Sequence, residues 1–374
     1  MGVIIPKDYL VVKCSVIGEW KLALQANKSY TDPTMNIGIA FDLKPDEPLP
    51  PGAPDDLHEE FDAPVTIRAI ADVLRSLGHT VRELGDGKPL LQALLNDPPD
   101  FVFNFAEGIG TARSREARVP AVCEMLGIPY TGSDPLAQAV ALEKDMTRRL
   151  AMDAGVAVPL GITLRPPVEK YDGDFAEFPP ILAEAGMALP VIAKPVFEGS
   201  SKGIRNRCLI EKLEDLGPTI AFLWNNYHQA VLVEEFIPGD EITVGIIGND
   251  PPEIFGIMKI TPKTPVEKFV YSLEVKREYR KLIDYECPAK LPAETTRELE
   301  ACALAVWDAL GIRDVARLDF RLKDGKPIFI EINPLPGLNP ESSDLVIMAD
   351  LLKISHRELV AKIFDAAVIR VNRK

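Results

Sequence analysis

Two short segments near the C-terminal end of the chain carry oxygen ligands at a spacing that suits a divalent metal ion. Asp319 lies in the segment Arg317–Phe320, and Glu331 and Asn333 follow within Phe329–Asn333. Because side chains alternate along a strand, Glu331 and Asn333 are expected on one face of a sheet. Two carboxylates and an amide carbonyl are ligands that Mg²⁺ accepts, with water and nucleotide phosphates completing its shell. The spacing therefore predicts magnesium-assisted phosphate chemistry.

The residues between these ligands are apolar, which favours a metal site over the alternative of a solvated strand face. These neighbours are Leu318, Phe320, Ile330 and Ile332. They predict that the opposite face of both strands is buried, and acidic groups on an internal strand need a partner. Arg317 precedes Asp319 by two residues, so it shares that face and could neutralise phosphate charge beside the metal.

Lys194 ends an apolar segment and is followed by the glycine- and serine-rich turn Glu198–Gly203. A lysine on a strand beside a loop of small residues can contact phosphates while backbone N–H groups of the loop bind other phosphate oxygens. The turn lacks the GxxxxGK[ST] pattern of a Walker A loop. A tight turn without any ligand is the alternative interpretation of this segment.

Two further segments have both a structural and a functional interpretation. Leu232–Ile237 runs into Pro238–Glu241, which reads as a strand entering a hinge. Backbone groups there could bind an adenine edge, and Glu241 could bind ribose hydroxyls. The charged segment Phe269–Tyr285 contains Lys276 and is either a solvated surface loop or a mobile lid over phosphates.

The elements that must position these residues begin at Met35. An alternation of strands and helices is expected at 35–41 (strand), 64–77 (helix), 80–84 (strand), 89–95 (helix) and 101–105 (strand). Strands separated by helices predict a parallel sheet with ligands near the carboxyl ends of its strands. Asn104 and Glu107–Gly108 lie at such an end.

Further elements complete two more units. We expect helices at 143–154 and 292–310, and strands at 191–195, 231–235, 241–248, 254–260, 314–322 and 327–333. The length of 374 residues suits this organisation. We therefore predict an α/β protein with units at 35–143, 144–238 and 239–374. Residues 1–34 are expected to be an N-terminal appendage of unknown role.

The overall composition excludes several classes of function. The net charge is −14 and the isoelectric point is about 4.9, which argues against a nucleic-acid-binding surface. Five widely spaced cysteines without a CxxC pair indicate a reducing compartment, and hence a cytoplasmic protein, and argue against a zinc site or a disulfide framework. No apolar run reaches the length of a membrane span.

Taken together, these segments resemble the ATP-grasp superfamily, and specifically the D-alanine–D-alanine ligase family. The resemblance runs from about Met35 to the C-terminus and is carried most closely by Gly127–Ser133, Lys194–Gly203, Arg317–Phe320 and Glu331–Gly337. It implies an ATP-grasp fold with an N-terminal parallel-sheet domain (the pre-ATP-grasp domain) and ATP in a cleft between the central and C-terminal units. The implied activity is a Mg²⁺-dependent carboxylate–amine ligase that acts through an acylphosphate.

The resemblance also implies roles for individual residues. ATP would be bound by Lys144, Lys194, Glu234, Phe236, Ile237, Glu241 and Lys276. Two Mg²⁺ ions, which Mn²⁺ can replace, would be held by Asp319, Glu331 and Asn333. Arg317 and the Gly337 backbone would stabilise the tetrahedral intermediate, and Ser200 would lie near the first amino acid. Ser342 and Ser343 match positions that hold the carboxylate of the second substrate.

The sequence departs from the family on the substrate side. A long Pro- and Asp-rich loop replaces the usual first motif, and it leaves Glu60, or alternatively Glu59, to orient the first amino acid's ammonium group. The lid pair Lys-Tyr becomes Lys276-Arg277. Two D-alanines, as used in peptidoglycan synthesis, are the expected substrates. The alternatives are a ligase for other amino or hydroxy acids and a non-catalytic ATP-binding regulatory protein. The resemblance also suggests a homodimer, which no sequence feature shows.

Overall fold

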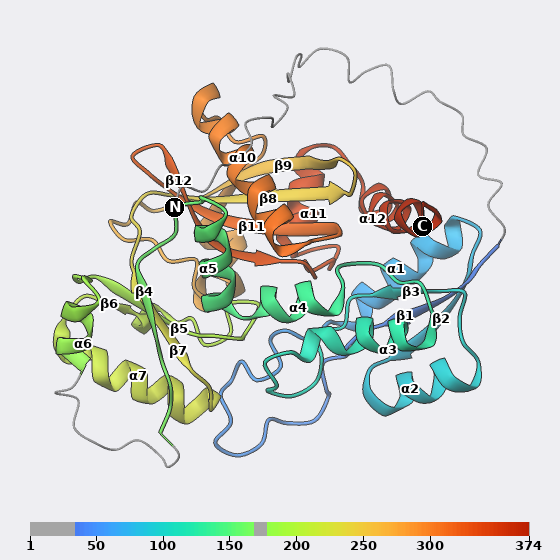
Figure 1. Cartoon of the computed structure of the whole chain (residues 1–374), viewed down its shortest axis with the longest axis horizontal. Helices are drawn as coiled ribbons and strands as arrows, with labels where there is room; N and C mark the ends of the chain where they lie inside the picture. The colour runs from blue at the N-terminus through green and yellow to red at the C-terminus, as the bar shows by residue number, and fades with distance from the viewer. Residues whose placement is uncertain (1–33, 168–177, 374) are drawn as a thin grey trace, which may run out of the picture. The chain divides into compact units, whose positions relative to one another are not determined.

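Three β-sheets and the helices packed on them make up the part of the chain that the computed structural model describes, residues 34–167 and 178–373 (Figure 1). All of these described residues except Thr34 belong to one compact unit, Met35–Lys374. The predicted appendage, residues 1–34, lies outside the described residues except for Thr34. The strands and helices predicted from Met35 onward are all present, within a few residues of their predicted bounds.

The N-terminal sheet is parallel, as predicted, with the strand order β2-β1-β3. Its strands are β1 (Asn36–Ala40), β2 (Thr80–Gly85) and β3 (Phe101–Asn104). Its helices are α1 (Pro64–Ser76), α2 (Gly87–Asn96) and α3 (Arg118–Leu126), preceded by the 3₁₀ turn η2 (Arg115–Ala117). The loops after β1 and β3 therefore meet at one edge of this sheet, where parallel α/β sheets place ligands.

The second sheet is antiparallel and has the order β4-β7-β5-β6. Its strands are β4 (Gly161–Leu164), β5 (Val191–Pro195), β6 (Leu209–Ile210) and β7 (Val231–Glu235). The helices that pack on this sheet are α6 (Phe178–Glu184) and α7 (Leu213–Tyr227), and η4 (Asn206–Cys208) is a 3₁₀ turn of this region. Helices α4 (Pro135–Leu142) and α5 (Lys144–Asp153) pack instead in the core of the third sheet. Helix α7, which the sequence did not predict, covers the sheet with its apolar face.

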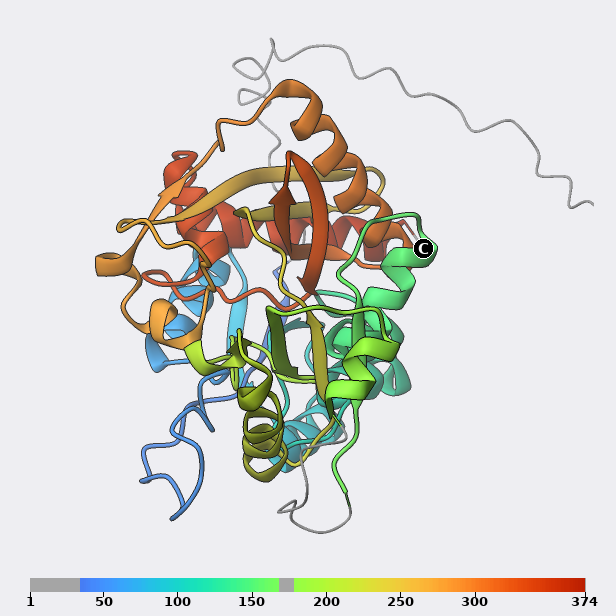
Figure 2. The same cartoon turned by 90° about the vertical axis from the view of Figure 1, so that its left-hand side faces the viewer.

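The third sheet is also antiparallel and has the order β10-β9-β8-β11-β12. Its strands are β8 (Asp240–Gly248), β9 (Pro252–Pro262), β10 (Ile283–Glu286), β11 (Asp314–Lys323) and β12 (Lys326–Asn333). Helix α10 (Ala293–Leu310) packs on one face of this sheet. The segment between β9 and β10 contains two short helices, α8 (Leu273–Arg277) and α9 (Tyr279–Leu282), and reaches across to the turn at 201–206 (Figure 2).

One prediction about the strand pair β11–β12 is wrong. Ile330 was expected on the buried face, but it is only half-buried and lines a cavity. The reason is a β-bulge, because Asp319 pairs with Glu331 while the next residue, Phe320, pairs with Phe329. The bulge shifts the alternation by one residue, so Phe329 takes the core position beside Phe320.

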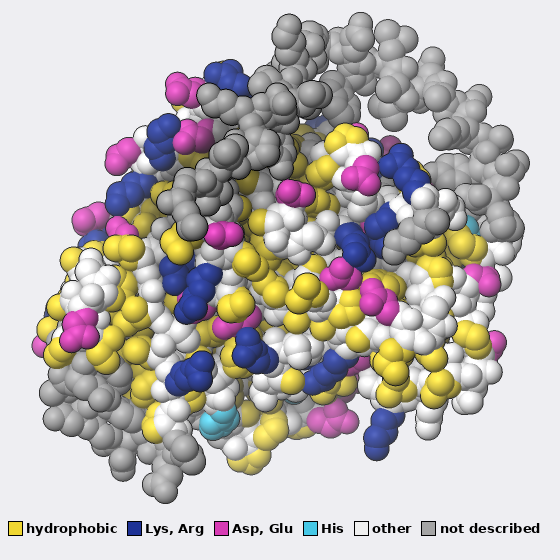
Figure 3. Space-filling model, viewed as in Figure 1, with side chains coloured by type: hydrophobic (Ala, Val, Ile, Leu, Met, Phe, Trp, Pro, Cys, Tyr) yellow, Lys and Arg dark blue, Asp and Glu magenta, His cyan; other side chains and the backbone are white. Residues whose placement is uncertain are grey.

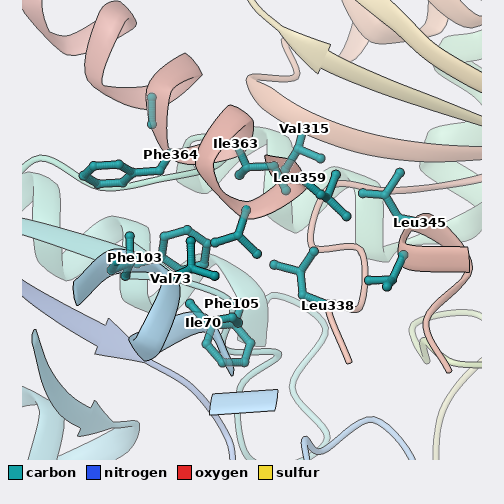
Figure 4. Packing of buried hydrophobic residues seen from close by; sticks show 14 of the residues in the cluster. Ile70, Val73, Phe103, Phe105, Val315, Leu338, Leu345, Leu359, Ile363 and Phe364 are labelled. Atoms are coloured by element: carbon teal, nitrogen blue, oxygen red, sulfur yellow. The ribbon is translucent and has the colours of Figure 1, made fainter. Parts of the chain in front are cut away.

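The largest hydrophobic core joins the first and last parts of this unit. Ile70 and Val73 of α1 and Phe103 of β3 pack with Leu359 and Phe364 of a C-terminal helix (Figure 4). The two C-terminal helices are α11 (Asp344–Leu351) and α12 (His356–Asn372). The sequence analysis predicted neither helix. Their packing fixes the N-terminal sheet beside the third sheet.

The surface and the helices show ordinary features of a globular protein. On the face in Figure 3, lysine and arginine side chains are interspersed with aspartate and glutamate side chains. Within the described ranges, none of the helices is both long and apolar enough to cross a membrane.

Candidate active site

Two adjoining cavities lie where the three sheets meet. The larger has a volume of about 340 Å³ and is lined by residues of all three sheet regions, and the smaller has a volume of about 90 Å³. Tyr271, Lys276 and Glu331 line both cavities, so the two adjoin at these residues, and we refer to them together as the cleft.

The predicted metal ligands are brought together by the pairing of β11 with β12. Asp319 lies directly opposite Glu331, and Arg317 lies opposite Asn333. The amide of Asn333 is 3.4 Å from Asp319 Oδ2, and Thr243 on β8 donates a hydrogen bond of 2.9 Å to Asp319. All three oxygen-bearing side chains are therefore within one small region of the sheet.

Cations surround this acidic pair. Lys144 Nζ lies 3.7 Å from Glu331 Oε2, and Arg317 forms an ion pair of 2.9 Å with Asp319. Burial alone would raise the pKa of Glu331, but the charges of nearby lysines and of Arg317 outweigh it and hold the pKa at about 2. Glu331 is therefore ionised at neutral pH, as a metal ligand must be.

The three predicted phosphate-binding lysines converge on the same place from three elements. Lys144 at the start of α5 donates to the carbonyl oxygen of Glu198, and Lys194 on β5 forms an ion pair with Glu234 on β7. Lys276 lies on α8, with its Nζ 5.0 Å from the ring centre of Tyr271. The segment that carries Lys276 is tied to the turn at 201–206, where Ser201 Oγ donates to the carbonyl of Tyr271 at 3.3 Å.

The smaller cavity is lined by the predicted adenine and ribose residues Glu234, Phe236, Ile237 and Glu241. Arg321, which the sequence analysis missed, organises them. It forms an ion pair with Glu241, donates to the carbonyl of Ile237 at 3.0 Å and stacks 5.4 Å from the ring centre of Phe236. Its position two residues beyond Asp319 on β11 was a signal that could have identified it.

At the far end of the larger cavity, Glu60 and Glu198 are held by two buried cations. Arg115 Nη2 lies 2.7 Å from Glu60 and 3.3 Å from Glu198, and its side chain is fully buried. Lys202 Nζ lies 2.7 Å from Glu198 and 3.6 Å from Glu60. The backbone N–H of Gly199 also donates to Glu60. The predicted ammonium ligand Glu60 therefore lines the cavity but already has several partners.

Glu59, the alternative to Glu60, also has a partner. Arg277 Nη2 lies 2.7 Å from Glu59 Oε2, and Arg277 Nη1 lies 2.7 Å from Asp55. Arg277, which stands in place of the tyrosine of the family's lid pair, therefore forms ion pairs with acidic residues of the long loop after β1.

Two further carboxylates line the larger cavity without such partners. Glu107 follows β3, and Glu116 lies in the 3₁₀ turn before α3. Burial raises the pKa of Glu116 to about 8, and the pKa of Glu107 is raised for the same reason. The sequence analysis placed Glu107 at a strand end without assigning it a role, and it missed both Glu116 and Arg115.

The remaining predicted substrate residues all line the larger cavity. Ser200 has a backbone φ of 50°, so its turn projects the exposed side chain into the cleft. A Cβ atom on Gly337 would lie 2.7 Å from Ser343 Oγ, so a larger residue there would require the Ser343 side chain to move. Ser342 is exposed, while the hydroxyl of Ser343 accepts a hydrogen bond of 2.9 Å from the Asn339 backbone.

Asp344, which the sequence analysis missed, connects these substrate residues to Arg317. Its carboxylate lies 3.2 Å from Arg317 Nη1 and accepts a hydrogen bond of 3.0 Å from Tyr271. Arg317 is thereby fixed between Asp319 and Asp344, and its guanidinium faces the larger cavity.

The donor set suits a hard cation that shares its ligands with phosphates. In the described ranges no group of three or more His, Cys, Asp or Glu residues forms a complete metal cage. The set of Asp319, Glu331 and Asn333 contributes two carboxylates and an amide, and an ion bound there would need additional oxygens from a bound ligand. These residues therefore fit Mg²⁺ in the presence of a nucleotide.

Comparisons with known proteins agree with this geometry. Residues 169–365 match the family model described as the D-ala D-ala ligase C-terminus. A D-alanine–D-alanine ligase from Aquifex aeolicus is 34% identical over 279 residues, covering 73% of this chain and 84% of that protein. An uncharacterized protein, y4sG, from Sinorhizobium fredii is 30% identical over 356 residues, covering 93% of this chain and 96% of that protein.

Solved structures show the same fold. The crystal structure of a D-alanine–D-alanine ligase from Bacillus anthracis matches with a TM-score of 0.67 and 21% sequence identity, covering 91% of this chain and all of that chain. A structure of a D-alanine–D-alanine ligase from the same organism complexed with ATP matches with a TM-score of 0.65 and 21% identity over 92% of this chain and all of that chain.

Proposed function

This chain belongs to the D-alanine–D-alanine ligase family, whose members are ATP-dependent ligases, and on that premise we propose that it joins two amino acids through an acylphosphate. The two substrates that the family relationship favours are D-alanines, and the product would be a peptide-bonded precursor of peptidoglycan.

The observation that carries this proposal is the convergence of phosphate-binding and metal-binding side chains on one cleft. Lys144, Lys194 and Lys276 come from α5, β5 and α8, and they meet Asp319 and Glu331 on β11 and β12. Each of these five side chains lines one or both cavities. Such a cluster of alternating charges stabilises a transferring phosphoryl group, for which positioning and charge neutralisation are the main requirements.

We assign the ATP-binding roles along the cleft. Adenine would lie in the smaller cavity against Phe236 and Ile237, with Glu234 at its edge and the ribose near Glu241. The triphosphate would extend past the three lysines toward the larger cavity. Asp319, Glu331 and Asn333 would hold Mg²⁺, which supplies neutralisation of phosphate charge when bound.

The chain's own residues then act on the two amino acids in the larger cavity. The carboxylate of the first attacks the γ-phosphorus of ATP, which gives an acylphosphate and ADP. The amine of the second attacks the acyl carbon, and phosphate leaves. Arg317 and the backbone at Gly337 would stabilise the oxyanion, with Arg317 held by Asp344. Ser200 would contact the first amino acid, and Ser342 and Ser343 the carboxylate of the second.

Release of inorganic phosphate tests the function. Purified protein is incubated with ATP, Mg²⁺ and a panel of D- and L-amino acids and hydroxy acids. Phosphate release that depends on D-alanine, with D-alanyl-D-alanine detected by mass spectrometry, is the expected result. Release with other acids alone would support a ligase of different substrate range. No release across the panel, despite ATP binding, would indicate an ATP-binding protein without turnover.

Our proposals for the domain organisation, the cellular location and the oligomeric state also rest on the family relationship. We propose that the three sheets correspond to units at 35–143, 144–238 and 239–374, although the core around α12 joins the first and third units. We also propose that the protein acts in the cytoplasm, on small molecules, as a homodimer. Size-exclusion chromatography with light scattering would test the dimer.

A further inference from the structure

The carboxylates at the substrate end of the cleft fall into two groups. Those in the first group are already neutralised by the protein. Glu60 and Glu198 share Arg115 and Lys202, and Glu198 also accepts a hydrogen bond of 2.6 Å from Gln229. Further ligands for these side chains would have to displace buried cations, which is costly.

Glu107 and Glu116 form the second group. Across residues 34–167 and 178–373, neither side chain has a hydrogen-bond or ion-pair partner, although both line the larger cavity. Glu116 is only 5% exposed, and Glu107 is half-buried. Glu107 also reaches the phosphate-side turn, since a Cβ atom on Gly199 would lie 3.5 Å from its Oε2 atom.

Two carboxylates in this position cannot both carry charge without a partner. Burial of an ionised carboxylate without a hydrogen bond or counter-ion is strongly unfavourable. Burial raises the pKa of Glu116 against the opposing charges of Arg115 and Lys144, and the charge of Glu116 in turn raises the pKa of Glu107 further. A bound cation would relieve this repulsion.

We propose that Glu107 and Glu116 bind the α-ammonium group of the first amino acid, the one whose carboxylate is activated. This assignment rests on the ligase function proposed above and replaces Glu60 as the ammonium ligand. The cleft then matches a zwitterion, because Lys144 lies between these two carboxylates and the metal-binding strands. Glu60 and Arg115 act as positioning residues that hold the loop at Gly199.

The arrangement also determines which acids the first subsite accepts. A hydroxy acid such as D-lactate, or a simple acid such as propionate, has no positive charge to offer. Its binding would leave Glu107 and Glu116 unpaired, and sites built for a charged group reject analogues that lack it. The first subsite therefore selects amino acids over hydroxy acids.

Calorimetric titration with D-alanine, in the presence of a non-hydrolysable ATP analogue and Mg²⁺, tests the site. Glu107→Gln and Glu116→Gln keep the shape of each side chain and remove its charge. We expect each to weaken D-alanine binding about 10- to 100-fold, as for the loss of a charge-assisted hydrogen bond. Propionate should not bind measurably. Glu83→Gln, on an exposed position of β2, is the matched control and should bind D-alanine normally.

The outcomes separate this proposal from the ligase function. Unchanged D-alanine binding by both glutamine variants, or equal binding of propionate and D-alanine, would overturn the ammonium site. Failure of the wild-type protein to bind D-alanine would also overturn it. D-alanine binding that weakens in both variants, without phosphate release by the wild type, would support the ammonium site and refute the ligase function. Urea unfolding of each variant verifies that it is folded.

Discussion

The end of the cleft that we propose binds ATP, around Glu331, and the end that we propose binds the amino acids, around Glu116, treat a glutamate in opposite ways. At the ATP end, Glu331 lies among cations that outweigh the effect of burial and hold its pKa at about 2. At the substrate end, Glu116 is more deeply buried than Glu331 and has no ion-pair partner among the described residues, and burial raises its pKa to about 8. Both side chains are glutamates in the same cleft, so the difference comes from their burial and from the charges of their neighbours.

The difference between the pKa values of these two glutamates indicates which kind of ligand each end of the cleft can bind. The convergence of Lys144, Lys194 and Lys276 favours an anion such as a triphosphate. Burial and mutual repulsion raise the pKa values of Glu107 and Glu116, so a cation such as an ammonium group would stabilise their ionised forms. An amino acid bound between the two ends would satisfy both, with its carboxylate toward the phosphates.

The largest effect is expected at the ATP end. Glu331→Gln removes a proposed metal ligand and the charge opposite three lysines. We expect kcat for phosphate release to fall at least about 10²- to 10³-fold while the fold is retained. The measurement is phosphate release at saturating ATP, with circular dichroism to verify folding. Glu298→Gln, a charged surface position paired with Lys326, is the control and should leave kcat unchanged. Near-normal activity of Glu331→Gln would refute the metal assignment.

Removal of the buried cation at the substrate end should mainly affect stability. Arg115→Ala leaves Glu60 and Glu198 buried with only Lys202 between them. We expect the free energy of unfolding to fall by about 3–5 kcal/mol, the usual cost of breaking a buried ion pair from one side. Urea denaturation measures it. Arg118→Ala, an exposed position nearby, should change stability by less than about 0.5 kcal/mol. Equal effects of the two substitutions would contradict the structural role of Arg115.

The raised pKa of Glu116 predicts a pH-dependent gain in stability when its charge is removed. In the absence of substrate, the folded protein holds the Glu116 proton more tightly than the unfolded chain, so wild-type stability falls as pH rises from about 5 to about 8. Glu116→Gln should therefore be more stable than the wild type at pH 8, by on the order of 1–3 kcal/mol, and nearly equal to it at pH 4.5.

The measurement for Glu116 is urea unfolding of both proteins across this pH range. The groups that face Glu116 are Arg115, Lys144, Glu60, Glu198 and Glu107, and both proteins retain them. The difference between the two curves therefore isolates residue 116. A difference that does not vary with pH would show that Glu116 is not buried without a partner.

The smallest effect is expected at the rim of the cleft. Arg277 pairs with Asp55 and Glu59, but its side chain is 36% exposed and Asp55 is largely solvated. Arg277→Ala should lower the free energy of unfolding by less than about 1 kcal/mol, because exposed ion pairs contribute little. Thermal denaturation at low and high salt measures it. A loss as large as that of Arg115→Ala would place the Arg277 contacts among the interactions that hold the fold.

The residues that we propose hold the metal ion could be picked out from the sequence because they follow one another on regular strands. Arg317 and Asp319 are two residues apart on β11, and Glu331 and Asn333 are two residues apart on β12. Because side chains alternate between the two faces of a strand, the members of each pair lie on the same face, independently of the rest of the chain. Even here, the β-bulge after Asp319 places Ile330 on the cavity face. A bulge depends on how two strands pair, so it cannot be recognised from the order of apolar and polar residues in one strand.

The helices that complete the unit were harder to predict. Helices α11 and α12 contribute much of the core shared with the N-terminal sheet, yet their sequence was not recognised as helical. Their apolar faces can be recognised only together with the surfaces that they cover, which lie on α1 and β3 of the N-terminal region and on β8, β9 and β11 of the third sheet. Packing of this kind is a property of the folded chain.

The sequence by itself determined the family, the parallel N-terminal sheet and which residues of β11 and β12 share a strand face, because those signals lie within short segments of the chain. Only the tertiary structure decided the substrate end. Glu60, Glu107, Glu116 and Glu198 come from separate loops and turns, and whether each is paired depends on where Arg115 and Lys202 lie in space. A carboxylate's charge state is set by burial and neighbours, and the sequence specifies neither until the chain has folded.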